Sequence, residues 1–476
     1  MGTRAIAKKA VRKARSKRPA TEHMSPVDTA WLRMDTPANL MMILGVWLIK
    51  PGVDYAAVCE RLQERLLQYP RFGQRVVFGI KGPSWVAEDD FKIERHVVRE
   101  LLPPGPKSRE QQALQTRLAE LAVQPLDAQH PLWQFHLVEH YQGGSALIAR
   151  IHHCIADGVA LIGVTQSMVD GGLVRRPPQG LETKGDRPVG DWGGWLSDLL
   201  VSPQKGLESL LEKGVASVTG AGKMVSQAVL DGAALAFMPD DSPTRLKGLP
   251  GPAKRVAWCQ PLPFDEIKAT AHALNCSIND VLMSCVAGAI GAYLQASGDD
   301  IKGLEIRAMV PVNLRQPEDE GTLGNRFGLA PMVLPIGISN PVERLYEVRR
   351  RMHEMKLSYQ PLFTLGLLAA AGWMVKPGQD ALLGLFSKKT TAVLTNVPGP
   401  RVKLKFLGAT LDQDLVWVPQ YGTVGLGISI LSYGGGVQFG IISDAGLCPE
   451  PQKIIEKFEP EFAKLSFLAL MLPWGE

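Results

Sequence analysis

The chain has little cysteine, and its cysteines show none of the spacings used for bridges or metal sites. Its 476 residues include six cysteines, and none of them forms a C-x-x-C pair. Scattered thiols are typical of a protein in the reducing cytoplasm, and they argue against a disulfide scaffold or a zinc site. The sequence therefore predicts a cytoplasmic protein with free thiols and no bound metal.

Long hydrophobic runs are also missing. No stretch has the roughly 18 uninterrupted apolar residues of a membrane-spanning helix. The first residues lack the long apolar core of a secretory signal peptide. We therefore expect a protein that is soluble or bound to a membrane surface.

Acidic residues are absent from the start of the chain. Residues 1–18 hold eight of the 52 basic residues, so the remainder has 44 basic and 47 acidic residues, a net charge near −3. One interpretation is a solubilising arm; the other is peripheral attachment to an anionic membrane or lipid inclusion. No nucleic-acid partner is expected, because no basic patch interleaved with aromatic residues follows in the body.

The length and the composition along the chain predict several units. A chain of this size exceeds what one hydrophobic core usually supports. Residues 172–255 begin with a stretch rich in proline and glycine and continue with leucines at helical spacing between 207 and 218. We predict a basic tail at 1–23, an N-terminal domain at 24–171, a linker and helical connector at 172–255, and a C-terminal domain at 256–476.

The local patterns predict an α/β protein. Apolar and β-rich runs predict strands at 40–50 and 146–151, and a pair of strands joined by a glycine turn at 427–443. Leucine and valine at helical spacing predict helices at 53–67 and 110–124. The sequence "RIHHCIADGVAL" (150–161) then falls between a strand and a helix, where α/β proteins often expose functional groups.

The two histidines of this stretch have the chemistry of a base. Imidazole has an ordinary pKa of about 6.5, so a neutral histidine can take a proton near pH 7. The residues alone leave an alternative open, an exposed strand end followed by an ordinary Asp-Gly turn. A metal site would need a third ligand, which the sequence does not offer. Cys154 is interpreted as a small buried residue, not as a nucleophile.

Motifs along the whole chain resemble those of one enzyme family. His152-His153-x-x-x-Asp157-Gly158 resembles the HHxxxDG motif of CoA-dependent acyltransferases and peptide-synthetase condensation domains. Further stretches, in the expected order from about 24 to 470, are similar to the bacterial wax ester synthase/diacylglycerol acyltransferase family. They are "MSPVDTAWLRMDTPANLMMI" (24–43), "PRFGQRVV" (70–77), "FKIERHVVRELLPPG" (91–105), "PLWQFHLVE" (131–139), "SINDVLMSCVAGAI" (277–290), "VPVNLR" (310–315), "GNRFG" (324–328) and "TNVPGP" (395–400).

The resemblance implies a reaction and a role for each residue of the histidine motif. Such enzymes move a fatty acyl group from acyl-CoA to a long-chain alcohol or to diacylglycerol. His153 would be the general base, and no covalent acyl-enzyme is needed. His152 would support His153, Asp157 would shape the loop with Arg315 as partner, and Gly158 would let the backbone turn and a substrate approach.

Second-half motifs add further candidates. Asn279 is a catalytic candidate that either caps the following helix or donates a hydrogen bond into the site. Asp280 is carried with the substrate-binding residues, although its role is expected to be more structural. Thr395 and Asn396 are candidate donors to the developing oxyanion. Pro131, Leu132 and Trp133 are interpreted as packing.

The resemblance also implies a fold: two chloramphenicol-acetyltransferase-like α/β domains with mixed sheets flanked by helices, joined by a helical connector. The active site would be a tunnel at their interface, with acyl-CoA as co-substrate and no cofactor. The DFGWG motif of plant alcohol acyltransferases is absent, which argues against that branch. Two alternatives remain, a condensation-type enzyme that uses carrier-protein thioesters and a lipid-surface protein without catalysis.

Overall fold

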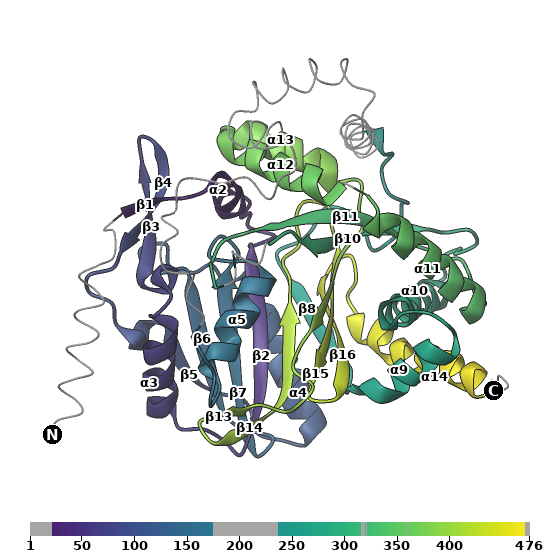
Figure 1. Cartoon of the computed structure of the whole chain (residues 1–476), viewed down its shortest axis with the longest axis horizontal. Coiled ribbons are helices and arrows are strands. Elements are labelled where there is room, and N and C mark those ends of the chain that lie inside the picture. Colours follow the sequence, from purple (N-terminus) through teal and green to yellow (C-terminus); the bar gives the residue numbers. More distant parts are fainter. Residues whose placement is uncertain (1–20, 175–236, 316–318, 320, 359, 472–476) are drawn as a thin grey trace.

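Two mixed β-sheets with flanking helices form the body of the molecule (Figure 1). The computed structural model describes residues 21–174, 237–315, 319, 321–358 and 360–471. The predicted α/β class, with mixed sheets flanked by helices, is confirmed. The basic residues 1–18 and the predicted connector helix at 207–218 lie outside the described residues.

The first sheet has the strand order β13-β14-β2-β7-β6-β5. Its strands are β2 (Met42–Lys50), β5 (Val97–Leu101), β6 (Trp133–Tyr141), β7 (Gly144–His152), β13 (Lys405–Phe406) and β14 (Ala409–Trp417). The strands predicted at 40–50 and 146–151 are therefore confirmed. β13 and β14 come from the predicted C-terminal region but complete the sheet of the first half, with β14 paired antiparallel to β2. The domain boundaries at 171 and 255 stay a prediction.

Burial on both faces explains why β2 is almost continuously apolar. Leu44, Val46 and Leu48 share a core with helix α4 (Lys107–Val123). Ile43 and Trp47, on the opposite face, share a core with α3 (Tyr55–Leu66) and α5 (Gly158–Met168). The helices predicted at 53–67 and 110–124 are thus confirmed as α3 and α4, and both cover the sheet that carries the histidines.

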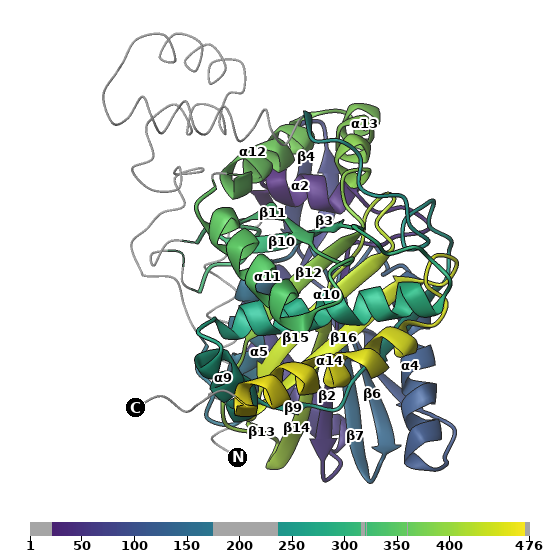
Figure 2. The same cartoon turned by 90° about the vertical axis from the view of Figure 1, so that its right-hand side faces the viewer.

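The second sheet has the order β11-β10-β12-β15-β16-β8, with β9 also paired to β16. Its strands are β8 (Lys254–Trp258), β9 (Leu262–Pro263), β10 (Ile306–Asn313), β11 (Phe327–Leu334), β12 (Ala392–Pro398), β15 (Leu426–Tyr433) and β16 (Gly436–Asp444). The helices that share its core are α9 (Phe264–Ala273), α10 (Ile278–Ala296), α11 (Pro341–Lys356) and α14 (Pro451–Met471). Figure 2 shows α10 and α14 lying across this sheet. The glycine turn predicted between two strands is confirmed by β15 and β16, since Gly434 and Gly435 both have positive φ.

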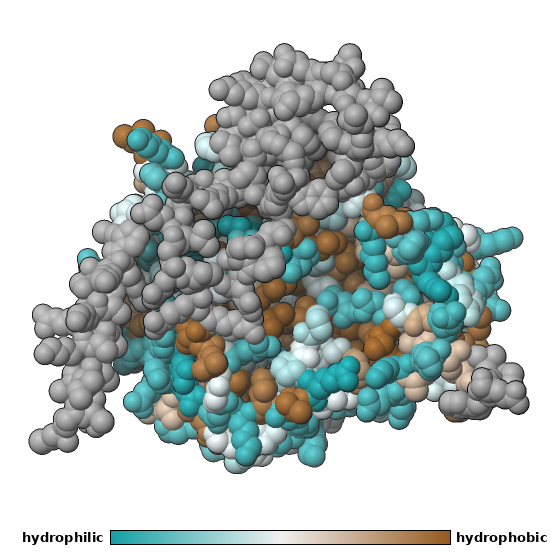
Figure 3. All heavy atoms as spheres, viewed as in Figure 1, coloured by the Kyte–Doolittle hydropathy of each residue, from teal (hydrophilic) through white to brown (hydrophobic). Residues whose placement is uncertain are grey.

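A smaller group of elements lies at one end of the molecule, at the top of Figure 1. It consists of β1 (Thr21–His23), β3 (Gln74–Gly79), β4 (Gly82–Ala87), α2 (Pro26–Arg33), α12 (Gln360–Trp373) and α13 (Lys376–Ser387). Two short 3-10 helices, η1 (Pro70–Gly73) and η2 (Ile93–Arg95), lie between strands of the first half. β3 and β4 form a protruding hairpin with an apolar tip (Figure 3), where Phe78 and Ile80 are exposed. Contacts between α2 and α12 join the first half to the second.

None of the described helices is by itself long and apolar enough to cross a membrane. α9 and α10 reach that length and composition only when taken together, and they are bent by 99° at their junction. Most of α10 is buried in the core of the second sheet.

Candidate active site

The histidine motif occupies the connection between β7 and α5, as predicted from the sequence. β7 ends at His152, and α5 begins at Gly158 with Asp157 as its N-cap. The carboxylate Oδ1 of Asp157 accepts a hydrogen bond of 2.9 Å from the backbone N–H of Ala160. Such a cap satisfies one of the N–H groups that every helix start leaves without a partner. The cap therefore fixes the loop in which both histidines lie.

The other carboxylate oxygen of Asp157 binds the second half of the chain. Oδ2 accepts hydrogen bonds from Nη2 of Arg315 at 2.9 Å and from the backbone N–H of Arg326 at 2.8 Å. The Arg315 and Asp157 side chains are only 8% and 4% exposed. The predicted pairing with Arg315 is confirmed. Every oxygen of this carboxylate is used inside the protein, as a loop-shaping role requires.

His153 lies where the loop of the first half meets the loop between β10 and β11. Its backbone N–H donates to the carbonyl of Met41 at 2.7 Å, and its ring stacks on Trp31 with centroids 4.0 Å apart. Nδ1 lies 2.8 Å from Oδ1 of Asn325. Among the residues that the structure describes, none hydrogen-bonds to Nε2. The ring is thus held in place through one nitrogen and one face.

Burial determines the charge of His153. The side chain is 5% exposed, and the loss of hydration lowers its pKa from 6.5 to about 4, while the negative charge of Asp157 opposes the change. The imidazole is therefore neutral near pH 7. A neutral imidazole is the form that can accept a proton.

Asn325 was not assigned a role from the sequence, although the stretch "GNRFG" contains it. Its Nδ2 donates to Oδ1 of Asp28 and to the carbonyl oxygen of His153, both at 2.8 Å. Asp28, on α2, is 1% exposed and pairs with Arg71 at 2.9 Å. Three segments far apart in the sequence therefore converge on His153.

His152 turns away from Asn325. Its Nδ1 accepts a hydrogen bond of 3.2 Å from the backbone N–H of Cys154, and its Nε2 lies 3.3 Å from Oδ2 of Asp35. An Nδ1 that accepts an N–H carries no hydrogen, so the proton of the neutral ring is on Nε2, facing Asp35. Cys154 is fully buried, in agreement with its interpretation as a small internal residue.

Gly158 does not need glycine for its backbone conformation, because it lies in the first turn of α5 without a positive φ. The expectation that it lets the chain turn is therefore wrong. A Cβ added there would meet no heavy atom within 4 Å, so the space beside it is open. The close approach of a substrate to this position stays a prediction.

The Asn-Asp pair lies at the start of α10, but Asn279 does not cap the helix. The N-cap is Ser277, whose Oγ accepts the N–H of Asp280 at 3.1 Å while the Asp280 carboxylate accepts the N–H of Ser277 at 2.8 Å. This reciprocal capping box explains Asp280 structurally. The capping alternative for Asn279 is wrong, because a better cap stands two residues earlier. Asn279 is exposed, and its Oδ1 accepts a hydrogen bond of 2.8 Å from Nδ2 of Asn396.

The structure does not bring Thr395 and Asn396 to one point. They are neighbours in β12, so their side chains point to opposite faces of the sheet. Thr395 is buried, and its hydroxyl donates weakly to the carbonyl of Ile428 at 3.4 Å. Only Asn396 lies beside Asn279.

Trp133 of the "PLW" stretch is a packing residue, as expected. It is 1% exposed, its Nε1 donates to the carbonyl of Phe72 at 2.9 Å, and its ring stacks on His96.

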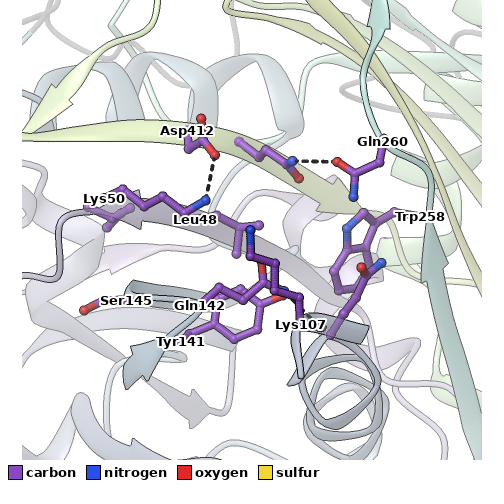
Figure 4. Close-up of a pocket in the computed structure, with 12 residues that line it drawn as sticks. Leu48, Lys50, Lys107, Tyr141, Gln142, Ser145, Trp258, Gln260 and Asp412 are labelled. Carbon is purple, nitrogen blue, oxygen red and sulfur yellow. Dashed lines mark hydrogen bonds and ion pairs between the residues drawn. The ribbon is translucent and has the colours of Figure 1, made fainter. Parts of the chain in front are cut away.

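One cavity of about 200 Å³ lies away from the histidines (Figure 4). Lys50, Lys107, Tyr141, Trp258 and Gln260 contribute to its lining. Lys50 ends β2, whereas His152 pairs with Met42 at the opposite end of that strand. This cavity therefore contains none of the predicted site residues.

Comparison with solved structures identifies the fold. A wax ester synthase/diacylglycerol acyltransferase from Marinobacter aquaeolei VT8 superposes with a TM-score of 0.65 at 22% identity, over 94% of this chain and 100% of that chain. The first condensation domain of the CDA synthetase superposes with a TM-score of 0.57 at 15% identity, over 95% and 96% of the two chains. These likenesses confirm the fold expected of the two-sheet acyltransferases and condensation domains.

Sequence comparison is more specific. Residues 24–282 match the wax ester synthase/diacylglycerol acyltransferase catalytic domain, and residues 323–466 match the C-terminal domain of the same family. A probable diacylglycerol O-acyltransferase of Mycobacterium tuberculosis (tgs1) is 25% identical over 459 residues, 93% of this chain and 95% of that protein. A second from the same organism (tgs2) is 27% identical over 464 residues, 93% and 98% of the two chains. The chain belongs to the wax ester synthase/diacylglycerol acyltransferase family and is an acyltransferase.

Proposed function

We propose that the protein transfers a long-chain fatty acyl group from acyl-CoA to the hydroxyl of a fatty alcohol, of diacylglycerol, or of both. The observation that carries this proposal is the state of His153. Its Nδ1 and one ring face are held by the protein, its Nε2 has no partner among the described residues, and its imidazole is neutral near pH 7.

In the proposed reaction, His153 moves one proton and forms no covalent bond. Nε2 takes the proton of the acceptor hydroxyl while the hydroxyl oxygen attacks the thioester carbonyl carbon. When the tetrahedral intermediate collapses, the C–S bond breaks and the imidazolium returns the proton to the CoA thiolate. A positioned base of this kind contributes about 10²–10⁴ in rate, and holding both substrates in register contributes more.

A donor for the negative charge on the intermediate is proposed at Asn279. The Asn396 amide donates to Oδ1 of Asn279, so the NH₂ group of Asn279 is the end left to donate. Hydrogen-bond donors aimed at a developing oxyanion are a large source of rate enhancement. His152, Asp157 and Asp280 act in this proposal by shaping the two loops. Gly158 leaves room for a substrate to approach, and the buried Thr395 is not assigned a contact with substrate.

The names of the relatives support both acceptors, because they include diacylglycerol acyltransferases and a wax ester synthase. We also propose that residues 1–18 make peripheral contact with an anionic membrane or a lipid inclusion. The support for this contact is the positive charge of these residues.

The test is thiol release from palmitoyl-CoA by the purified full chain, with hexadecanol or dioleoylglycerol as acceptor and the ester product identified by mass spectrometry. We expect acceptor-dependent release that falls at least about 100-fold in His153→Ala. His272→Ala, on the exposed last turn of α9, is the matched control and should keep the activity.

An unchanged rate in His153→Ala would overturn the proposed base. Ester formation only from a phosphopantetheinyl carrier-protein thioester, with none from acyl-CoA, would favour the condensation-type alternative. If neither donor supports transfer, the proposed function fails.

A further inference from the structure

We propose that Asn325 and Asp28 are positioning residues that hold His153 in one tautomer, with its hydrogen on Nδ1 and its lone pair on Nε2. This inference rests on the proposed function, in which Nε2 is the base. In this proposal, the side chain of Asp28 on α2 and that of Asn325 in the loop between β10 and β11 determine which ring nitrogen of His153 reacts.

An asparagine on its own does not choose a tautomer. Its amide presents an acceptor and a donor of nearly the same shape, and either can face an imidazole nitrogen. Asn325 is constrained because its Nδ2 faces two groups that can only accept, the Asp28 carboxylate and the backbone carbonyl of His153, each at 2.8 Å. Its Oδ1 must therefore point to Nδ1 of His153, also at 2.8 Å, and that nitrogen must carry the hydrogen.

Asp28 is itself held in place by donors on both of its carboxylate oxygens. Its Oδ1 also accepts the backbone N–H of Asn325 at 3.2 Å, and its Oδ2 accepts from Nη1 of Arg71 at 2.9 Å. Arg71 is fixed in turn, because it donates to the carbonyl of Ile155 and lies over the ring of Trp85. Because each of these partners donates to Asp28, its carboxylate acts only as an acceptor. Arg71 thus fixes the position of Asp28, Asp28 fixes the orientation of the Asn325 amide, and this amide fixes the tautomer of His153.

An amide between carboxylate and imidazole orients the ring without adding a charge next to it. A carboxylate in direct contact would stabilise the imidazolium and raise the pKa of the ring. The ring is surrounded by several charged groups that are paired with one another. They are Asp28 with Arg71, and Asp157 with Arg315 and with the backbone of Arg326. With Asn325 in contact, the ring keeps its position and stays neutral.

The first measurement is the tautomer itself. In full-length protein labelled with ¹⁵N-histidine, the resonances of His153 are assigned by their loss in His153→Ala. We expect the protonated nitrogen to be Nδ1 in the wild type. A wild-type protein with the hydrogen on Nε2 would overturn the proposal even if every variant failed to fold. This arm needs no substrate, so it separates failure of this inference from failure of the proposed function.

The second measurement uses Asp28→Asn, Asn325→Ala and Asn325→Asp. Asp28→Asn lets the Asn325 amide rotate, so Nε2–H should appear. The kcat should fall by about 10²–10⁴, the usual contribution of a positioned base; amidating the tautomer-fixing aspartate of a hydrolase triad costs about 10⁴. The kcat of Asn325→Ala should fall by a similar factor. Asn325→Asp brings a charge to Nδ1, so the acidic limb of the kcat/KM profile should move to higher pH by about one unit or more.

The matched control is Asn340→Ala. It removes the N-cap of α11, where Oδ1 accepts from the N–H groups of Val342 and Glu343, and should cost about 1 kcal/mol of stability. In this variant, the tautomer of His153 and the pH profile of kcat/KM should equal those of the wild type. If the Asp28 and Asn325 variants also keep the wild-type tautomer and pH profile, Asn325 is a structural residue and the proposal is overturned.

Discussion

Replacing Arg315 with methionine removes the cation that neutralises a buried carboxylate and keeps an unbranched apolar stem. Nη2 of Arg315 lies 2.9 Å from Oδ2 of Asp157. Two unit charges at this distance attract by about 6 kcal/mol when the effective dielectric constant is about 20. The N–H groups of Ala160 and Arg326 still bind the carboxylate in the variant. We therefore expect Arg315→Met to lower the free energy of unfolding by about 3–5 kcal/mol, the usual cost of breaking a buried pair.

A double-mutant cycle separates this pair from its surroundings. The free energy of unfolding is measured by urea denaturation for Arg315→Met, for Asp157→Asn and for the double variant. Asp157→Asn removes the charge that Arg315 neutralises, so the second substitution should cost less than it does alone. We expect a coupling energy of at least about 2 kcal/mol. Simple additivity, or a loss below about 1 kcal/mol in Arg315→Met, would refute the view that the pair is buried and coupled.

Three further predictions concern packing and pH. Gly288→Ala should lower Tm by several degrees, because its Cβ would lie 2.6 Å from Nη2 of Arg344 and against the carboxylate of Glu461; an unchanged Tm would contradict the geometry. Trp133→Ala should cost about 3–5 kcal/mol of stability and leave kcat of the folded enzyme unchanged, whereas a specific loss of kcat would mean a role beyond packing. Because burial lowers the pKa of His153 from 6.5 to about 4, the unfolded chain binds more protons between these values. The free energy of unfolding should then fall by up to about 3 kcal/mol as the pH drops through that window, and less in His153→Phe, measured by denaturation at each pH.

Elements whose signals are local could be predicted from the sequence. The β-rich run at 146–151 became β7, and the apolar run after Asp157 became α5, because side-chain periodicity and turn residues act within a few positions. The start of α10 carries a helix-capping signal that the sequence contains but that the sequence-based prediction did not use. Ser277 and Asp280 have the S-x-x-D spacing of a capping box, and this explains both the cap and the Asp280 carboxylate.

The candidate site could be predicted only in part. His152, His153 and Asp157 stand together in the sequence, so one motif named them all. Asn325 reaches His153 across a separation of 172 residues along the chain, and Asp28 reaches Asn325 across 297 residues. No local pattern encodes such contacts. The partner of β2 was unpredictable for the same reason, because the apolar pattern of β14 predicts a strand but not the sheet that it joins.

The pairing of β14 with β2 has a consequence for the newly made chain on the ribosome. β2 ends at Lys50, but the strand that covers its open edge begins at Ala409, some 360 residues later. At about 5–20 residues per second, the ribosome needs roughly 20 to 70 s to make the missing strand. Through that interval a long apolar strand exposes unpaired backbone groups, which invite pairing with other chains. A fragment that stops before residue 405 would keep this edge permanently open, so we expect it to aggregate or to remain bound to a chaperone, and to regain solubility when residues 237–476 are co-expressed.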